Sequence, residues 1–242
     1  MAIVNETIVC EGDGVRLVND FYYDDAISGP RPGVLVHPDA RGYDDHTKNN
    51  ARRLASLGFA AMACDLHGEQ RYYPDGAEAI ALVTPMAQKP ARMRARARAE
   101  YEAFIARPEV DSGKVASIGY CMGGNMSVEL ARDGVPLAAA VGFHGGVTPP
   151  SLEDSKKITG KVLICTGASD PFIPLESRAR FEKDMTEAGV DWRMHVYGGV
   201  YHSFTNKTFI EPEGDPVTNL YDESANNRSW NEMMSLFKEV FG

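Results

Sequence analysis

The chain contains 242 residues, of which 43% are hydrophobic and 24% are charged, and it carries a formal net charge of −9. This length fits a single α/β domain with a sizeable core better than two domains. The negative charge argues against nucleic acid and against an anionic membrane surface as main partners. No apolar run approaches the ~20 residues of a membrane span. No signal peptide is visible after Met1, so we expect a soluble, cytoplasmic protein.

The sequence contains four cysteines, which are few for its length: Cys10, Cys64, Cys121 and Cys165. Three of them lie inside apolar, strand-like segments. Such thiols fit a reducing compartment better than a disulfide framework. The spacing of the cysteines and histidines does not indicate a zinc site, so we expect no metal.

The chain begins with a predicted β-hairpin. Glu6–Cys10 and Val15–Tyr23 are strand-like, and Glu11-Gly12-Asp13-Gly14 between them is a strong turn signal. Apolar strands then alternate with amphipathic helices, which predicts a parallel sheet covered on both faces. In the first half of the chain these elements are a strand that begins at Val34, a helix over Thr47–Leu57 and a strand over Phe59–Cys64.

A polar and aromatic segment interrupts this alternation between Leu66 and Pro90. It contains a predicted short helix over Ala77–Met86. A segment of this kind after the carboxyl end of a strand tends to cover the ligand crevice of the sheet. A variable surface insertion is the alternative interpretation.

The next predicted helix runs to about Ala106 and opens with four arginines at alternating positions: Arg92, Arg94, Arg96 and Arg98. Helical spacing places the first and third on one face and the second and fourth on another. An anion-binding site is one interpretation of this cluster, and a solvated helix face is the other.

The second half of the chain continues the alternation. Its predicted strands are Lys114–Ile118, Leu137–Phe143, Lys161–Thr166 and Trp192–Val196, and its predicted helices are Asn125–Arg132, Pro174–Ala188 and Ser229–Phe241. The chain shows no internal repeat, low-complexity segment or linker. We therefore predict one α/β domain over residues 1–242, with a mostly parallel sheet, helices on both faces and an N-terminal β-hairpin.

The segment Gly119-Tyr120-Cys121-Met122-Gly123 joins a predicted strand to a predicted helix. This is the context of a nucleophile elbow, with Cys121 in the place that serine usually holds. The flanking glycines let the strained turn close, and the N-terminus of the helix favours the thiolate, which is the attacking form. A buried structural cysteine beside a glycine-rich turn is the alternative.

Two further residues complete a candidate catalytic triad. Asp170 follows one predicted strand and His202 follows the last, so both should lie at the sheet edge where Cys121 emerges. The order Cys, Asp, His is that of α/β-hydrolases. Taken singly, Asp170 could be a turn residue and His202 a loop histidine. Weaker candidates for the base are His37, His144 and His195, which lack a paired acid after a neighbouring strand.

Acyl transfer also requires donors for the developing oxyanion. The backbone N–H of Met122 would supply one donor at the start of the helix. The second should come from the loop after the strand that begins at Val34, where Ala40 is the best candidate.

These motifs resemble the dienelactone hydrolase family of α/β-hydrolases over nearly the whole chain. The likeness rests on Gly119-Tyr120-Cys121-Met122-Gly123-Gly124, Gly167-Ala168-Ser169-Asp170 and His202-Ser203-Phe204. It implies an α/β-hydrolase fold and hydrolysis of small ester, lactone or thioester bonds through an acyl-enzyme, without a cofactor. It also implies that Cys121 is the nucleophile and that Asp170 and His202 complete the triad.

The sequence departs from the family pattern around the expected substrate pocket. Asp39 stands where the family has a glutamate near the resting thiol and is one methylene shorter. Glu69 and Asn206 stand where the dienelactone enzymes use two arginines to grip a substrate carboxylate. With Tyr120 and Phe204 these residues form the expected pocket and its surroundings. The departures predict a substrate other than carboxylated dienelactone.

Two functions from different classes follow from these patterns. The first is a hydrolase of small esters, lactones or thioesters. The second is a non-catalytic protein that binds a small molecule in the α/β-hydrolase pocket. Retention of Cys121, Asp170 and His202 favours the hydrolase, because a binding protein has no need of them.

Overall fold

The structure, a computed structural model, describes residues 2–242. Met1 lies outside them. The predicted domain and the N-terminal segment without a visible signal peptide both begin at this residue. Within the described residues the strands form one eight-stranded sheet in the order β1-β2-β4-β3-β5-β6-β7-β8. The strands are β1 (Ile3–Gly12), β2 (Val15–Asp24), β3 (Arg31–His37), β4 (Ala60–Ala63), β5 (Val110–Tyr120), β6 (Ala139–Phe143), β7 (Lys161–Gly167) and β8 (Trp192–Tyr197).

The sheet is antiparallel at its N-terminal edge and parallel elsewhere. β1 pairs with β2 and β2 with β4 in antiparallel fashion, and the pairs from β4 to β8 are parallel. The hairpin turn is shorter than the predicted four residues. Asp13 and Gly14 form it with φ angles of 55° and 68°, and Asp-Gly is a favoured sequence for such two-residue hairpin turns.

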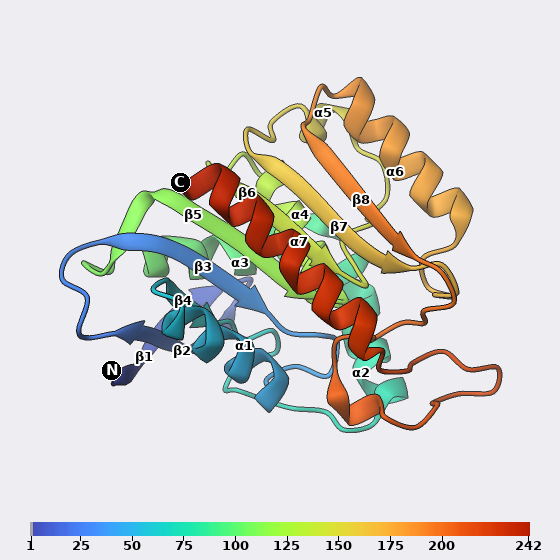
Figure 1. Ribbon diagram of the computed structural model, residues 1–242, viewed down its shortest axis with the longest axis horizontal. Helices are drawn as coiled ribbons and strands as arrows, with labels where there is room; N and C mark the ends of the chain where they lie inside the picture. The colour runs from blue at the N-terminus through green and yellow to red at the C-terminus, as the bar shows by residue number, and fades with distance from the viewer. Residues whose placement is uncertain (1) are drawn as a thin grey trace.

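Helices cover both faces of the sheet, as predicted (Figure 1). One face is covered by α1 (Asp45–Ser56) and α7 (Glu223–Phe241), and the other by α3 (Pro90–Ile105), α4 (Met122–Arg132) and α6 (Leu175–Glu187). The remaining helices are α2 (Gly76–Ala87), the short α5 (Leu152–Ser155) and the 3-10 helix η1 (Lys207–Phe209). The predicted α/β-hydrolase architecture is therefore confirmed.

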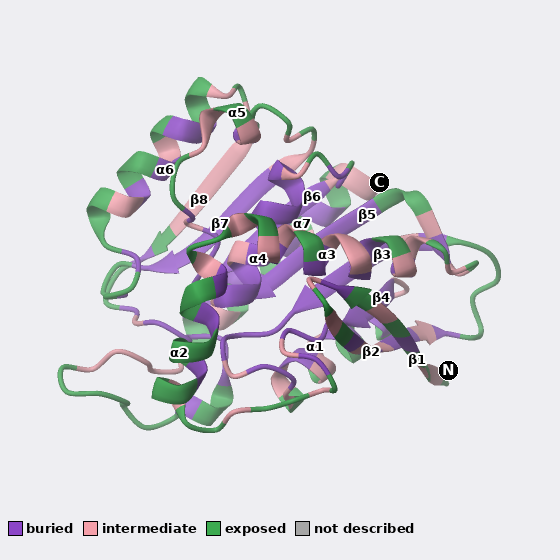
Figure 2. Cartoon of the chain, turned by 180° about the vertical axis from the view of Figure 1, so that it is seen from behind, coloured by how far each residue is buried: buried purple, intermediate pink, exposed green. Residues whose placement is uncertain are grey.

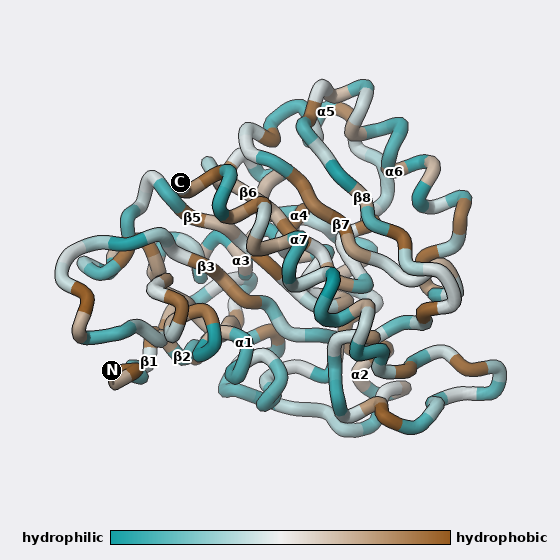
Figure 3. The backbone as a smooth tube through the Cα atoms, viewed as in Figure 1, coloured by the Kyte–Doolittle hydropathy of each residue, from teal (hydrophilic) through white to brown (hydrophobic). Residues whose placement is uncertain are grey.

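The central strands supply the core. β3, β5, β6 and β7 are buried over most of their length (Figure 2). They are also among the most hydrophobic stretches of the chain (Figure 3). A strand covered on both faces needs apolar residues at consecutive positions, which explains why these segments are nearly continuous apolar runs.

The last helix begins earlier than the sequence predicts. α7 starts at Glu223, whereas the apolar periodicity predicts a start at Ser229. The carboxylate of Asp222 accepts a hydrogen bond from the N–H of Ala225 at 2.7 Å. This N-cap stabilises a polar first turn that hydrophobic patterning cannot reveal.

The strand order places a crevice at the carboxyl ends of the central strands. The chain adds β4 on one side of β3 and β5 on the other. Loops that leave neighbouring strands in opposite directions open a crevice at such a switch point, and α/β proteins bind ligands there. Among the described residues, no helix is long and apolar enough to cross a lipid bilayer.

Candidate active site

Cys121 occupies a strained turn between β5 and α4. Its φ of 51° and ψ of −113° place it in a region that non-glycine residues rarely adopt. A Cβ on Gly119 would lie 2.0 Å from the carbonyl carbon of Gly123, and one on Gly145 would lie 2.0 Å from the Cys121 carbonyl oxygen. Only glycine fits at either position, so the elbow predicted from the sequence is present. The contribution of Gly145 was not predicted.

The structure brings His202 and Asp170 together beside Cys121. Nδ1 of His202 lies 2.7 Å from Oδ2 of Asp170, and both side chains are buried. The other carboxylate oxygen of Asp170 accepts a hydrogen bond from the N–H of Phe172 at 2.9 Å, which fixes the carboxylate. Burial opposes protonation of the imidazole, but Cys121 and Asp170 outweigh it and raise the pKa of His202 to about 10.

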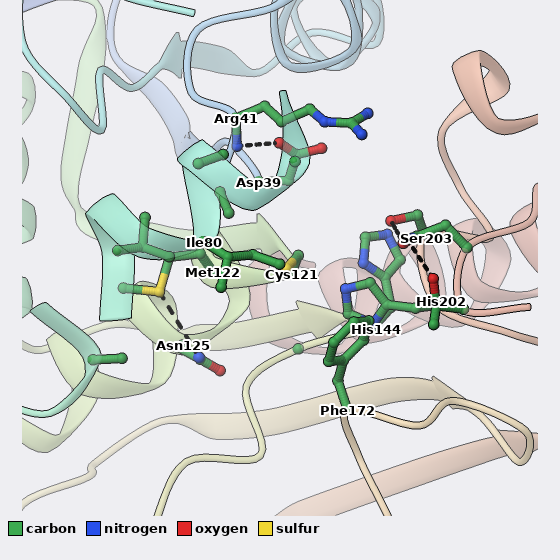
Figure 4. Close-up of a pocket in the computed structure, with 18 of the residues that line it drawn as sticks. Asp39, Arg41, Ile80, Cys121, Met122, Asn125, His144, Phe172, His202 and Ser203 are labelled. Atoms are coloured by element: carbon green, nitrogen blue, oxygen red, sulfur yellow. Dashed lines mark hydrogen bonds between the residues drawn. The ribbon is translucent and has the colours of Figure 1, made fainter. Parts of the chain in front are cut away.

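Cys121 and His202 line a cavity of about 600 Å³. In Figure 4, Met122 and Ile80 lie on one side of Cys121, and His144 and His202 lie on the other. Much of one wall comes from α2 and the residue before it: Asp75, Gly76, Ala77, Ala79, Ile80, Val83, Thr84 and Ala87. The interpretation of the segment between β4 and α3 as a cover for the ligand crevice is therefore confirmed.

The loop after β3 supplies three cavity-lining residues: Asp39, Ala40 and Arg41. Oδ1 of Asp39 accepts a hydrogen bond from the N–H of Arg41 at 2.8 Å. Burial and the neighbouring Asp44 raise the pKa of Asp39 to about 6. Within residues 2–242, no hydrogen bond joins Asp39 to the Cys121 thiol.

Arg41 is a cavity residue that sequence reasoning missed. Its guanidinium lies 4.6 Å from the ring centroid of Phe209, and its Nη2 lies 2.9 Å from Oε1 of Glu213. Among the described residues that line the cavity, Arg41 is the single lysine or arginine. Its position immediately after Ala40 was the available signal, but both partners lie more than a hundred residues away in the sequence.

The expectation that Glu69 and Asn206 face the substrate is wrong. Glu69 pairs with Arg16 at 2.7 Å, and both side chains are half exposed and lie outside the cavity lining. Asn206 is buried, but its Oδ1 accepts hydrogen bonds from the N–H and hydroxyl of Thr208 at 3.0 and 2.9 Å. It caps η1 and does not line the cavity.

Tyr120 and Phe204 lie behind the site. Tyr120 stacks on Phe143 with ring centroids 5.2 Å apart, and Phe204 meets the ring of His144 edge-on at 5.3 Å. The ring of His144 in turn lies 5.0 Å from that of His202. Both aromatic residues are buried and support the cavity wall without lining it.

The arginines at the start of α3 form ion pairs away from the cavity. Arg92 and Arg96 bind Asp13, Arg94 binds Glu129 and Asp154, and Arg98 binds Asp133. The two faces expected from helical spacing are therefore real, and each binds a different part of the chain. These contacts hold the hairpin and α4 against α3 and leave the anion-site interpretation without support.

Among the described residues, the other candidate bases His37, His144 and His195 make no hydrogen bond to a carboxylate. His144 lines the cavity, but its Nε2 lies 2.8 Å from the hydroxyl of Thr205, and burial lowers its pKa well below the ordinary value. His195 lies on β8, with its Nε2 3.5 Å from Glu232. His37 is buried outside the cavity against Glu100.

Comparison with known proteins identifies the family. The sequence profile of the dienelactone hydrolase family matches residues 21–241. The chain belongs to the dienelactone hydrolase family. This dienelactone hydrolase-family protein is therefore a hydrolase that acts on lactone or ester bonds, and the alternative of a binding protein without activity is set aside.

Individual relatives of this dienelactone hydrolase-family chain support the assignment. The chain is 40% identical to a "Dienelactone Hydrolase-like Promiscuous" phosphotriesterase from metagenomic libraries, with a TM-score of 0.93 and both chains covered completely. It is 28% identical to a "Probable 2-oxo-3-(5-oxofuran-2-ylidene)propanoate lactonase" of Bradyrhizobium, over 74% of this chain and 75% of that one. The dienelactone hydrolase of Anabaena variabilis shares the fold at 14% identity, with a TM-score of 0.70 and full coverage of both chains.

Proposed function

We propose that this protein hydrolyses small neutral esters, lactones or thioesters through an acyl-enzyme on Cys121, with His202 as acid and base and Asp170 as its orienting partner. One observation carries the proposal. His202 has an Asp170 oxygen 2.7 Å from Nδ1 and a pKa raised to about 10, and it shares a cavity with Cys121. An imidazolium at neutral pH pairs with a thiolate, which is the nucleophilic form of cysteine.

The reaction then proceeds in two steps, which are acylation of Cys121 and hydrolysis of the acyl-enzyme. The Cys121 sulfur attacks the carbonyl carbon, the bond to the leaving oxygen or sulfur breaks, and Nε2 of His202 gives its proton to the leaving group. Neutral His202 next takes a proton from water, whose oxygen attacks the thioester carbon. The bond from that carbon to the Cys121 sulfur breaks, which releases the acid product and restores the thiolate and the imidazolium. Asp170 holds the tautomer in which Nε2 faces the sulfur and stabilises the charged ring.

The oxyanion would form between two backbone N–H groups. Met122 and Ala40 both line the cavity with Cys121, and Met122 is the first residue of α4. The backbone directly after this N–H is held in place, because Nε2 of His67 lies 2.8 Å from the carbonyl oxygen of Ala40. Fixed donors stabilise a developing oxyanion more than mobile ones, since little reorganisation is needed during reaction.

The cavity favours neutral substrates for a reason different from the one expected. Glu69 and Asn206, which were expected to disfavour a carboxylate, do not line the cavity. Instead, Arg41, which lines the cavity, already pairs with Glu213. Asp39 and Asp75 add further acidic groups to the lining. A carboxylated substrate must therefore compete with Glu213 for its cation.

Phosphotriesters are a second candidate substrate class. The relative that is 40% identical over the whole chain is described as a promiscuous phosphotriesterase. A phosphotriester is a neutral electrophile, so it meets the same charge requirement as a neutral ester. Attack of the Cys121 sulfur on phosphorus would release one alcohol, protonated by His202.

The test of the function is a burst experiment with p-nitrophenyl acetate and a p-nitrophenyl phosphotriester. We expect a burst of nitrophenol with the wild type, together with a mass increase of one acetyl group on Cys121. Cys121→Ala should lose both, and Cys10→Ser, which changes a half-buried thiol on β1, should keep both. Full esterase activity in Cys121→Ala would contradict the proposal.

A further inference from the structure

A buried cluster of metal-ligating side chains lies outside the active-site cavity. His37 ends β3, Cys64 directly follows β4, and Glu100 lies on α3. All three residues are completely buried. One ligand atom from each lies within 4.8 Å of the other two. None of the three lines the cavity, so the catalytic proposal leaves the cluster without a role.

Hydrogen bonding does not satisfy these side chains. Among the described residues, neither ring nitrogen of His37 has a hydrogen-bond partner, and Oε2 of Glu100 has none. Nδ1 of His37 lies 3.5 Å from that oxygen, which is longer than the roughly 2.7–3.2 Å of a hydrogen bond between nitrogen and oxygen. The Cys64 sulfur makes one long contact, 3.7 Å from the Met62 carbonyl oxygen. Buried polar atoms without partners are costly and call for an explanation.

The same distance suits two ligands of one metal ion. A nitrogen and an oxygen that each lie about 2.0–2.1 Å from a tetrahedral zinc ion are separated by about 3.3 Å. The 3.5 Å between His37 and Glu100 is close to that value. The Glu100 carboxylate is already oriented, because its other oxygen accepts a hydrogen bond from the N–H of Asp65 at 2.9 Å.

We propose that His37, Cys64 and Glu100 form a buried binding site for a zinc ion, with three protein ligands. A neutral imidazole, a thiolate and a carboxylate together cancel the charge of Zn²⁺, so a bound ion would leave the buried cluster neutral. Imidazole and thiolate ligands exclude Mg²⁺ and Ca²⁺, which prefer oxygen. Binding breaks the S–H bond of Cys64, forms a bond from sulfur to zinc and releases the proton to solvent, with any proton on Glu100.

A metal ion at this site would hold the loop after β3, which lines the active-site cavity, in a fixed position relative to the sheet. Ala40 lies three residues beyond His37 and lines the cavity. The carbonyl oxygen of His37 is packed so closely against the elbow that a Cβ on Gly123 would lie 2.3 Å from it. An ion held by β3, α3 and the residue after β4 would fix these three elements together. Because the cluster is enclosed, the ion enters as the chain folds.

The test uses Cys121→Ala, so that the active-site thiol cannot bind metal. This variant is unfolded with chelator, refolded with Zn²⁺ alone, freed of excess metal and analysed by mass spectrometry. We expect about one zinc ion per chain and a higher Tm than after refolding with chelator. Adding Cys64→Ser or Glu100→Gln should remove most of the zinc. Cys165→Ser, which changes a buried thiol on β7, should leave it in place.

Cobalt supplies a readout that does not depend on how stable the variants are. Refolding Cys121→Ala with Co²⁺ should give the charge-transfer absorption of a thiolate bound to cobalt, and Cys121→Ala/Cys64→Ser should lack it. Zinc below about one ion per ten chains in Cys121→Ala would overturn the proposal. Equal zinc with and without Cys64, or cobalt bound without thiolate absorption, would also overturn it.

Discussion

Nδ1 of His202 lies 2.7 Å from Oδ2 of Asp170, and both groups are buried next to Cys121. This contact leaves Nε2 as the ring nitrogen that faces the sulfur. It also stabilises the imidazolium, whose pKa is raised to about 10 although burial works in the opposite direction. The protonation state of His202 should therefore govern how activity varies with pH.

The first prediction concerns this pair. The imidazolium is present below its pKa, so kcat/KM should hold through neutral pH and fall as pH rises toward about 10, where the leaving group loses its acid. Asp170→Asn removes one of the groups that raise the pKa, so the fall should move to lower pH. His202→Ala should lower kcat roughly 10³-fold.

The measurement is the pH dependence of p-nitrophenyl acetate hydrolysis at saturating and limiting substrate. His195→Ala, on the outer strand β8, serves as the control and should leave the profile unchanged. A profile of Asp170→Asn that superimposes on that of the wild type would remove Asp170 from the proposed role.

The second prediction concerns thiol reactivity. Burial raises the pKa of Cys10 and of Cys165 to about 12, and it raises the pKa of Cys64 well above the ordinary value. Cys121 is partly exposed and lies beside a protonated histidine. Iodoacetamide at limiting dose should therefore label Cys121 at least ~10-fold faster than the other thiols.

Peptide mass spectrometry over a time course measures the four rates. Cys121→Ala should lose the fast phase, and His202→Ala should slow it because the sulfur loses its charged partner. Comparable rates at Cys121 and Cys10 would contradict the proposed activation.

The sequence predicted that Cys121, Asp170 and His202 lie close together because their proximity follows from topology. Each member lies just after the carboxyl end of a parallel strand, and such ends meet at one edge of a sheet whatever the side chains between them. Cys121, Asp170 and His202 could therefore be placed together from strand order alone.

The prediction of the residues that set substrate specificity failed because the positions of these residues depend on loop conformation. Glu69 and Gln70 both have φ near 55°, and this tight turn directs Glu69 to Arg16 on β2. Counting residues from the end of β4 cannot reveal such a reversal. The partners of Arg41 and the ligands of the proposed zinc site come from elements far apart in the sequence. No short sequence motif therefore reveals either set of contacts.

The third prediction concerns Asp39. Its pKa in the folded protein is raised from the ordinary 3.8 to about 6. A raised folded pKa contributes stability that is fully present below pH ~4 and is lost as pH rises through about 6. Asp39→Asn has no charge to bury and keeps an oxygen for the N–H of Arg41. The free energy of unfolding of Asp39→Asn should therefore increase relative to that of the wild type as pH rises from 4 to 7, by up to about 3 kcal/mol.

Urea unfolding at several pH values between 4 and 7 measures this difference. Asp25→Asn, at an exposed position near the end of β2, is the control and should show no such trend. If the difference between Asp39→Asn and wild type is the same at pH 4 and pH 7, Asp39 does not titrate as the structure indicates.

The fourth prediction concerns substrate charge. Arg41 pairs with Glu213 at 2.9 Å, and the Glu213 side chain is 46% exposed while that of Arg41 is 16% exposed. Glu213→Gln should free the guanidinium for a carboxylate on the substrate. A charge-assisted hydrogen bond contributes about 1.5–3 kcal/mol. We therefore expect kcat/KM for a carboxylated ester to rise at least ~10-fold relative to a neutral ester of the same size.

The double variant Glu213→Gln/Arg41→Gln decides whether Arg41 carries this effect. It should lose the gain for the carboxylated ester and leave the neutral ester nearly unaffected, because a neutral ester offers no charge to the guanidinium. Glu211→Gln changes an exposed acid in the same loop and should not alter the ratio of the two substrates. If Glu213→Gln leaves that ratio at the wild-type value, the pair does not set specificity. If the double variant keeps the gain, another group binds the carboxylate.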